Sequence, residues 1–361
     1  MMRWSKFVAA VVFSGVLAAL CAAEEAGDRV LFLGDVHYDA KEYHPDYKNR
    51  SGFKRTLEMW EGKSQELLRA AAAQGERDKG GMVVQLGDII QGDADTLELQ
   101  EQMLRKAFSV VKSYFPGLPL AVVTGNHDIH IPGGNDNGPV ARALLPLVAS
   151  ELKMPKLADG NFSFRRGKDL FIAVDLSVWY ERNVKFVEKV LSENKDARYV
   201  FLLTHFPLFP ASVKVPLWLL RGNSEIAAML EKRKAVIFAA HTHVPSVVTR
   251  TTPNGKLLQV VVSSMGSSWD PERLVAPKVR DWEAFSAAVK RIKPRGMNKK
   301  IREMWPKLEA SGTYTYQCDF KNSGFVVLDA DDSRVEIRVY TDASGKPAQT
   351  LTLFGKNASD K

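Results

Sequence analysis

The sequence predicts an α/β fold, and three observations support this prediction. Apolar runs rich in β-branched residues alternate along the chain with segments that repeat apolar residues at helical spacing. Several apolar runs end in polar residues, as buried strands do where a loop begins. Hydrophobic residues make up 45% of the 361 residues, which is enough for a substantial core. Strands separated by helices of this length indicate one layered α/β domain.

The predicted strands share an apolar stretch that stops at a polar turn. In chain order they cover 29–37, 81–88, 118–128, 170–177, 198–206, 235–243 and 257–266. Apolar residues at helical spacing predict the helices between them, at 53–74, 96–115, 181–193 and 224–232. This alternation is the expected core of the domain.

The last third of the chain changes character. Residues 267–312 are polar, basic and punctuated by Trp, which predicts a helical insertion. Residues 324–341 read as two strands about a tight turn that contains Asp331 and Asp332. No repeat, long linker or low-complexity tract divides the chain, so we expect one catalytic-sized domain over 28–355.

Residues 1–23 have the three-part layout of a secretory signal peptide. The basic segment MMRWSK precedes an apolar run, and the small residues Cys21 and Ala23 precede the acidic EEAGD. We expect cleavage after Ala23, export to the periplasm or the medium, and no membrane span in the mature chain. An uncleaved membrane anchor is the alternative, although the run at 7–23 is shorter than the span of about 20 residues.

The composition and charge of the chain do not indicate a specific nucleic-acid partner. The formal net charge is +8, but Lys and Arg are spread along most of the chain. The densest basic run, KRIKPRGMNKKIR at 290–302, is interpreted as a solvated helix-and-loop surface, with an acidic ligand as the alternative. No recognisable nucleic-acid module accompanies it. Only Cys21 and Cys318 are present, so the mature chain would hold no internal disulfide.

Five predicted strand ends carry unusual polar chemistry, reading GDVH, GD, GNHD, THFP and AHTH. These ends contain Asp35, His37, Asp88, Asn126, His127, Asp128, His205, His241 and His243. Active sites of α/β sheets collect at the carboxyl ends of strands, where loops carry side chains outward. Asp88 alone would indicate a turn or cap, and His205 alone a buried histidine. Five of the seven histidines fall in these ends, which favours one shared site.

The donor types favour divalent metal ions. Aspartate, asparagine and histidine without thiolates suit hard to borderline cations such as Mn, Fe, Zn, Co or Ni, and the sequence does not select among them. His241 and His243 are two residues apart, so on extended backbone they would point the same way. The set is too large for one tetrahedral ion and suits two adjacent ions. Asp88, with no ligand-type neighbour, is the natural bridge.

The order Asp-x-His, Gly-Asp, Gly-Asn-His-Asp, a lone His and then His-x-His resembles the calcineurin-like metallophosphoesterase superfamily. The motifs cover about 29–244, and the closing strands extend the resemblance to 341. The resemblance implies a four-layer α/β/β/α sandwich of two mixed sheets, the metallo-dependent phosphatase-like fold. It also implies two divalent metal ions where the strands end.

The resemblance further implies a role for each residue. The metal ligands would be Asp35, His37, Asp88 and His243 for one ion, and Asp88, Asn126, His205 and His241 for the other. His127 would touch the substrate phosphate or protonate the departing oxygen, and Asp128 would orient its ring. Two cations about 3.5–4 Å apart would generate a bridging hydroxide that attacks phosphorus in line. Gly125 would let the backbone turn sharply before these residues.

Departures from the superfamily pattern narrow the expected activity. The second motif reads GDIIQGD, with Gln91 where Ser/Thr protein phosphatases have Asp, and no Arg follows. The tyrosine of purple acid phosphatases is also missing after this motif. We expect an exported phosphoester hydrolase acting on a small molecule, leaning to phosphomonoesterase or nucleotidase activity. Phosphodiesterase on a nucleotide or lipid diester, a nuclease, and a non-catalytic metal-binding protein of the same fold stay open.

Two histidines lie outside the motifs. His44 and His130 are each expected either in a substrate loop or at an ordinary surface position. The loops at 38–50 and 131–138 and the insertion at 267–312 would decide which phosphoester enters the site.

Overall fold

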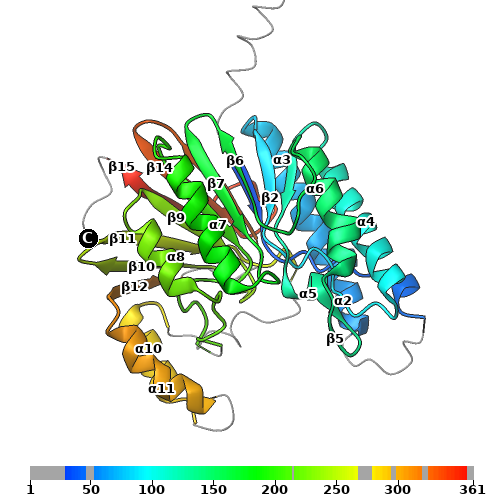
Figure 1. Ribbon diagram of the computed structural model, residues 1–361. Coiled ribbons are helices and arrows are strands. Elements are labelled where there is room, and N and C mark those ends of the chain that lie inside the picture. The colour runs from blue at the N-terminus through cyan, green and yellow to red at the C-terminus, as the bar shows by residue number, and fades with distance from the viewer. Residues whose placement is uncertain are drawn as a thin grey trace, which may run out of the picture.

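Two mixed sheets lie at the centre of the molecule, and helices cover their outer faces (Figure 1). The computed structural model describes residues 29–45, 53–213, 215–266, 279–293, 298–318 and 324–355. The predicted signal peptide at 1–23 lies outside the described residues. Within the described residues, no helix combines the length and the apolar character needed to cross a bilayer.

The first sheet has six strands in the order β15-β14-β13-β1-β2-β3. Their bounds are β1 (Val30–Leu33), β2 (Met82–Gln85), β3 (Leu120–Val122), β13 (Phe325–Ala330), β14 (Arg334–Tyr340) and β15 (Gln349–Gly355). The strands β1, β2 and β3 run parallel, and β13, β14 and β15 continue the sheet antiparallel. The sheet therefore combines a parallel half, which carries three of the polar strand ends, with an antiparallel half.

The second sheet has seven strands in the order β12-β10-β11-β9-β8-β7-β6. Their bounds are β6 (Phe162–Arg166), β7 (Asp169–Val174), β8 (Val200–Thr204), β9 (Ala235–Ala239), β10 (Ser246–Thr252), β11 (Gly255–Val261) and β12 (Thr313–Gln317). The strands β7, β8, β9 and β11 run parallel, while β6, β10 and β12 are antiparallel to their neighbours.

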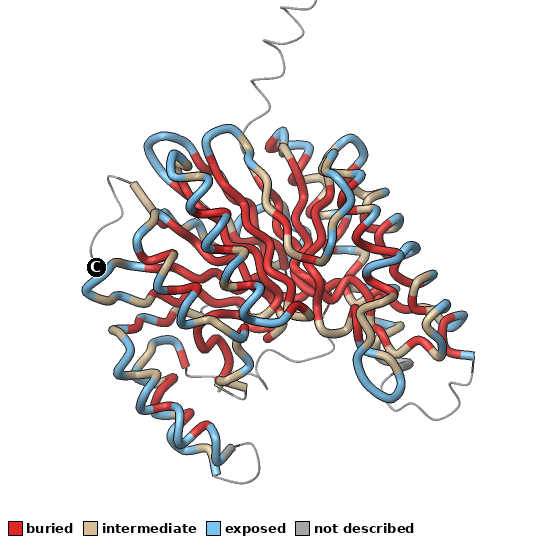
Figure 2. The backbone as a smooth tube through the Cα atoms, viewed as in Figure 1, coloured by how far each residue is buried: buried red, intermediate tan, exposed pale blue. Residues whose placement is uncertain are grey.

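The two sheets pack face to face through aromatic side chains. Phe32 of β1 stacks on Phe238 of β9, with ring centroids 3.9 Å apart. Every residue of β1 is buried, as expected for a strand covered on both faces. Side chains along β7 alternate between the two faces of the second sheet. Phe171 and Ala173 belong to the core between the sheets, whereas Ile172 belongs to the core on the other face. Figure 2 shows this buried centre within an exposed outer shell.

Helices complete the two outer layers. On the first sheet they are α2 (Phe53–Met59), α3 (Gln65–Arg77), α4 (Leu97–Tyr114) and α6 (Leu145–Glu151); on the second they are α7 (Tyr180–Glu193) and α8 (Asn223–Leu230). The predicted helix at 53–74 is thus two helices joined by a π-helical turn, Trp60–Ser64. A second such turn, Val140–Leu144, leads into α6, a helix that the apolar pattern did not predict. The four-layer α/β/β/α sandwich is confirmed.

The described part of the insertion is helical, as predicted. The helices α10 (Trp282–Lys290) and α11 (Asn298–Glu309) project past the sheets (Figure 1). Trp305 of α11 is buried against Phe285 of α10, with ring centroids 6.0 Å apart. The described basic residues of the run at 290–302 are exposed, so a solvated surface stays the prediction there, with an acidic ligand as the alternative.

The missed strands lie at sheet edges or beside them. The strands β6 and β12 read FSFRR and TYTYQ, and only alternate residues or fewer are buried. Such half-exposed edge strands lack the continuous apolar run that marks a central strand.

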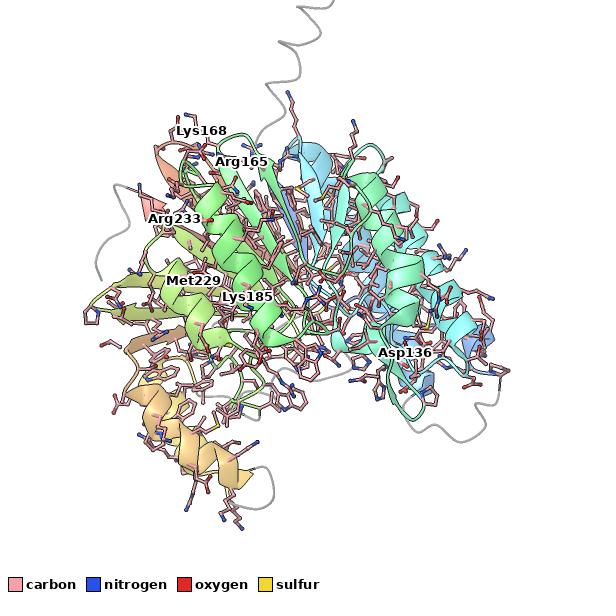
Figure 3. All side chains as sticks on the ribbon, viewed as in Figure 1. Asp136, Arg165, Lys168, Lys185, Met229 and Arg233 are labelled. Atoms are coloured by element: carbon pink, nitrogen blue, oxygen red, sulfur yellow. The ribbon has the colours of Figure 1, made fainter. Side chains whose placement is uncertain are left out.

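Ion pairs close the end of the molecule that lies away from the polar strand ends. Arg198 donates to both carboxylate oxygens of Asp169, at 2.9 and 2.6 Å, and to Asp332 in the β13–β14 turn at 2.9 Å. Lys168 also contacts Asp332. Figure 3 labels Lys168 at this end and Asp136, which follows β5 (Gly134–Asn135), near the other. The sheets are therefore joined by packing in the middle and by charge at one end.

Candidate metal centre

The polar residues singled out in the sequence lie where central strands end. They follow β1 (Asp35, His37), β2 (Asp88), β3 (Asn126, His127, Asp128), β8 (His205) and β9 (His241, His243). Asn126 begins the short helix α5 (Asn126–Ile129), and the hairpin of β4 (His130–Ile131) with β5 comes next. Because β1, β2 and β3 run parallel, as do β8 and β9, these ends collect at one edge of the sandwich.

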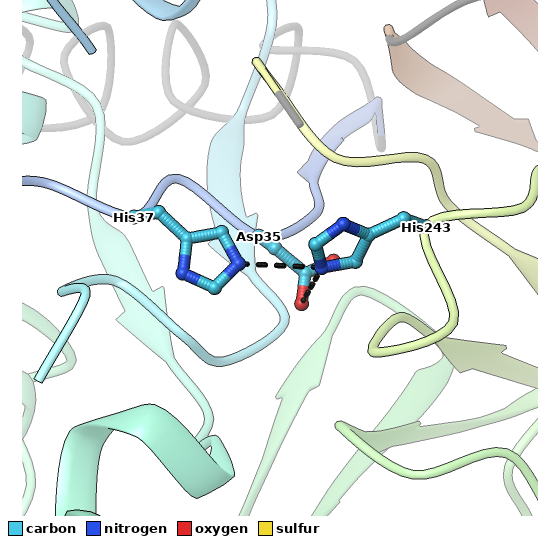
Figure 4. A group of neighbouring side chains, drawn as sticks. All are labelled: Asp35, His37 and His243. Atoms are coloured by element: carbon cyan, nitrogen blue, oxygen red, sulfur yellow. Dashed lines mark hydrogen bonds and ion pairs between the residues drawn. The ribbon is translucent and has the colours of Figure 1, made fainter. Parts of the chain in front are cut away.

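Asp35, His37 and His243 form a first group of ligand-type side chains (Figure 4). One ligand atom from each lies within 4.8 Å of the others. Nε2 of His37 lies 3.2 Å from Nε2 of His243, which in turn lies 3.5 Å from Oδ1 of Asp35. The three side chains point toward one another from the ends of β1 and β9 (Figure 4).

Asp88, His205 and His241 form a second group with the same 4.8 Å limit. Nε2 of His205 lies 3.2 Å from Oδ2 of Asp88 and 3.0 Å from Oδ1 of Asn126. Nδ1 of His205 donates to the carbonyl of Leu86 at 2.8 Å, so its Nε2 presents a lone pair to the group when the ring is neutral. The amide oxygen of Asn126 adds a neutral donor to this group.

Asp88 stands between the two groups. It belongs to the second group, and it also lies within 4.8 Å of ligand atoms of His37 and His127. Its Oδ1 accepts the backbone N–H of His127 at 2.7 Å, while Oδ2 faces His205. A carboxylate that faces both groups has the position that a bridge between two ions requires.

The backbone of the cluster is strained. Seven non-glycine residues of the described chain have positive φ, and four belong to the cluster: His37, Asp88, His241 and His243, at 50°, 55°, 67° and 55°. This conformation costs roughly 1 kcal/mol per residue, and such strain concentrates at functional sites. The expectation of extended backbone at the His-x-His motif is wrong, because both histidines have positive φ. His241 lies in the second group and His243 in the first, so the two histidines still face one cluster.

The electrostatic surroundings favour neutral imidazoles at two positions. Burial, and then the neighbouring His127, lower the pKa of His37 to about 3. Burial and His205 likewise lower the pKa of His241 to about 3. His205 differs, because burial would lower its pKa but Asp88 raises it to about 9. His37 and His241 are therefore neutral at pH 7, the form that binds metal ions.

Unpartnered polar atoms show that the cluster suits cations. Neither carboxylate oxygen of Asp35 has a hydrogen-bond partner among the described residues, although the side chain is fully buried. Nδ1 of His37 and Nε2 of His241 also lack one. Buried acceptors without partners are costly, and a bound divalent ion would satisfy them. The donor set of carboxylates, imidazoles and an amide fits Mn, Fe, Zn, Co or Ni.

The structure corrects the expected role of Asp128. Its carboxylate accepts backbone N–H groups of Gly125, Asp88 and Ile90 at 2.7, 3.0 and 3.3 Å. The ring of His127 is held instead by the carbonyl of Gln91, which accepts from Nδ1 at 2.6 Å. Asp128 therefore fastens the turn after β3 to the turn after β2, and a backbone carbonyl fixes the tautomer of His127.

Gly125 matters because of close approach. Its φ of −98° is open to any residue, so the expected sharp turn is not the reason for a glycine here. A Cβ at this position would overlap the backbone nitrogen and the carboxylate of Asp88. The absence of a side chain lets the turn after β3 touch the residue that stands between the two groups.

Two buried glutamines, which the sequence motifs do not include, hold the strand ends together. Gln85 of β2 donates to the carbonyls of Gly34 and Gly87 at 3.1 and 2.6 Å. Gln100 of α4 donates to the carbonyls of Asp128 and His130, both at 3.2 Å. A polar residue at a position where helical spacing predicts burial is the signal that could have identified Gln100.

The two additional histidines have different surroundings. His44 is buried, and its Nε2 lies 2.8 Å from Oδ1 of the buried Asp39, so the alternative of a surface position is wrong and a role in a substrate loop stays a prediction. His130 is half-exposed and pairs with Asp93 at 2.9 Å. It lines a cavity next to the cluster.

Two cavities adjoin the cluster. The large cavity, of about 600 Å³, is lined by Asp88, Asn126, His127, His130, Asn135, Phe206, Val215, Trp218, His241, Thr242 and His243. The small cavity, of about 130 Å³, is lined by Val36, His37, Thr56, Met59, Trp60, Ser64, Gln91, His127, His243 and Gly266. His127 and His243 line both, so the two cavities meet at the cluster.

Comparison with known families identifies one match. The family model described as Calcineurin-like phosphoesterase matches residues 28–245, which include every residue of the cluster. No curated protein sequence matches the chain.

Solved structures share the fold at low sequence identity. A dimetal phosphatase from Danio rerio is 14% identical with a TM-score of 0.53, over 90% of this chain and 98% of that one. A purple acid phosphatase from yellow lupin is 15% identical with a TM-score of 0.52, over 90% and 53%. GAP50, the anchor in the inner membrane complex of Plasmodium, is 12% identical with a TM-score of 0.51, over 91% and 89%. At these identities the likeness shows the fold alone.

The close approach at Gly125 gives a test of the cluster's assembly. In Gly125→Ala the new Cβ must displace Asp88, so we expect a loss of about 1–3 kcal/mol in the free energy of unfolding and less bound metal. Gly62→Ala is the matched control, because a Cβ there meets nothing within 4 Å. Denaturant melts and metal analysis measure both effects. Equal metal content in the two variants would show that the Gly125–Asp88 contact does not shape the cluster.

Proposed function

The chain belongs to the calcineurin-like phosphoesterase family, and we propose that the cluster at the strand ends is its active site. It is a metal-dependent phosphoester hydrolase with a dinuclear divalent metal centre. The observation that carries this proposal is the position of Asp88 between two groups of ligand atoms. When bound there, two divalent ions lower the pKa of coordinated water and neutralise phosphoryl charge.

We assign the metal ligands by group. Asp35, His37 and His243 would hold one ion, and Asn126, His205 and His241 the other, with Asp88 shared between them. The unpartnered oxygens of Asp35 and the lone pair of His241 support this assignment. Asn126 enters the second group through its amide oxygen, 3.0 Å from Nε2 of His205.

His127 is assigned to the substrate. Nδ1 donates to the carbonyl of Gln91, which leaves Nε2 for the substrate. When the ring carries a proton on both nitrogens, Nε2–H can give its proton to the departing oxygen and leave the neutral ring with Nδ1–H still bonded to Gln91. The ring lines both cavities, so a phosphoester bound at the cluster lies beside it. The ring also lies 4.8 Å from that of His37, and a ligand role for His127 is therefore the competing assignment.

Paired substitutions separate the two assignments. Asn126→Ala should lose metal, because it removes a ligand oxygen. His127→Ala should keep both ions and lose about 10²–10⁴ in turnover, the usual contribution of a general acid. Metal content by mass spectrometry and turnover of an aryl phosphate, measured on the same samples, report the two effects. An empty centre in His127→Ala would make His127 a ligand and refute its assignment to the substrate.

A phosphomonoester is the substrate class that we favour. A monoester has one organic group, and the large cavity provides space for one, with Asn126, His130 and Asn135 as polar groups at its wall. The small cavity supports the alternative of a diester, because a second organic arm could enter it from the same phosphorus. Its volume of about 130 Å³ limits that arm to roughly the size of benzene.

A substrate panel tests the proposed function. We expect the metal-loaded chain to hydrolyse p-nitrophenyl phosphate with a higher kcat/KM than bis-p-nitrophenyl phosphate, and chelation to abolish both activities. The panel is run with Mn, Fe, Zn, Co and Ni in turn. A preference for the diester would assign the chain to phosphodiesterases. Two bound ions without hydrolysis of either compound would instead support a non-catalytic metal-binding protein.

We also propose that the hydrolase is exported. The layout of residues 1–23 supports this proposal, with a basic start, an apolar run and small residues before Glu24. The mature protein would then start at Glu24 and be periplasmic or secreted. N-terminal sequencing of the exported chain should read EEAGD. Recovery of an intact N-terminus in the membrane fraction would point to the uncleaved anchor.

A further inference from the structure

An exposed tryptophan lines the large cavity. Trp218 is 43% exposed, and it is one of four large hydrophobic residues of the described chain that are exposed to this degree or nearly so. The ring lies in the wall of the cavity, together with Phe206 and Val215. Single exposed hydrophobic residues are ordinary on a protein surface. This one differs because it adjoins the residues of the proposed active site.

Two aromatic rings contact the same histidine of the cluster. The centroid of the Trp218 ring lies 4.9 Å from that of His241, and the two planes are inclined by 34°. Phe206 lies 4.1 Å from His241 at 39°. The rings therefore continue from the proposed metal ligand into the cavity wall. We call the two rings of Phe206 and Trp218, with Val215 beside them in the cavity lining, the aromatic wall.

The segment that carries Trp218 is anchored to the second sheet. The buried Gln259 of β11 accepts from the backbone N–H groups of Leu208 and Phe209, at 2.7 and 2.9 Å. Leu220 donates to the carbonyl of Pro207 at 2.9 Å and closes the base of the segment. The backbone N–H of Trp218 donates to Val215 at 3.1 Å. The ring is thus presented from a fixed base.

We propose that the aromatic wall is a binding subsite for a flat aromatic group attached to the phosphorus-bound oxygen of the substrate. This inference rests on the proposed function and specifies its substrate class as aromatic phosphoesters. A cavity of about 600 Å³ has the size of a small-molecule site. Aromatic pairs gain binding energy beyond that of burial alone, so the ring of Trp218 discriminates a flat aromatic group from a saturated one of equal size.

The test uses binding of compounds that the chain cannot hydrolyse. Phenylphosphonate and cyclohexylphosphonate carry the same charged group and differ in whether the six-membered ring is flat. Calorimetric titration of the metal-loaded chain gives the ratio of their Kd values. We expect phenylphosphonate to bind about three- to tenfold more tightly. In Trp218→Leu the ratio should fall to about one, whereas Trp218→Phe should keep most of it.

Controls separate recognition from support of the metal site. Inorganic phosphate should bind Trp218→Leu and wild type within about twofold, with two ions in each. Trp179→Leu should leave both the ratio of the two phosphonate Kd values and the metal content unchanged, because Trp179 is 72% exposed and does not line the cavity. An unchanged phenyl preference in Trp218→Leu overturns the subsite. Loss of metal and of phosphate binding in that variant also overturns it, because the ring would then only support His241.

Failure of the proposed function has a different signature. A wild-type chain that binds phenylphosphonate preferentially but hydrolyses no phosphoester would retain the subsite and lose the activity. A wild-type chain that hydrolyses phosphoesters without preferring the phenyl compound would retain the activity and lose the subsite.

Discussion

The parallel direction of the central strands is the constraint on which the rest of this structure depends. Because β1, β2 and β3 run in one direction, as do β8 and β9, their carboxyl ends deliver side chains from five separate segments to one edge. Stacking of Phe32 on Phe238 fixes the distance between the two sheets directly behind that edge. Asp35 from one sheet and His243 from the other can then lie within 3.5 Å. A slip of either sheet would separate the two groups of ligand atoms, so packing and chemistry are coupled here.

The conformation of the cluster is locally unfavourable, and the contacts around it and in the core compensate for this cost. Four of its residues have left-handed backbone, and the buried carboxylate of Asp35 has no hydrogen bond within the part of the chain that the structure describes. These features persist because surrounding bonds over-determine the turns, through Gln85, Gln100 and the carboxylate of Asp128. These hydrogen bonds hold the ligand-type side chains in one arrangement, which is the organisation that metal-assisted hydrolysis needs.

Much of this could be predicted from the sequence, and the failures have physical causes. The apolar runs that end in Asp, Asn and His predicted the central strands and the membership of the cluster, because burial and polarity are both visible in one dimension. Edge strands such as β12 were missed because partial exposure removes the apolar run. The role expected for Asp128 is wrong because its carboxylate accepts backbone N–H groups, which every residue except proline has, so the sequence does not show which partners it takes. Trp218 gave no signal either, since only the folded chain brings its segment to His241.

The central claim is that two divalent ions bind on either side of Asp88. Anomalous diffraction from crystals of the chain grown with Mn²⁺ tests it directly. We expect two peaks about 3.5–4 Å apart, one among Asp35, His37 and His243 and the other among Asn126, His205 and His241. A single peak, or two peaks that do not share Asp88, would contradict the account.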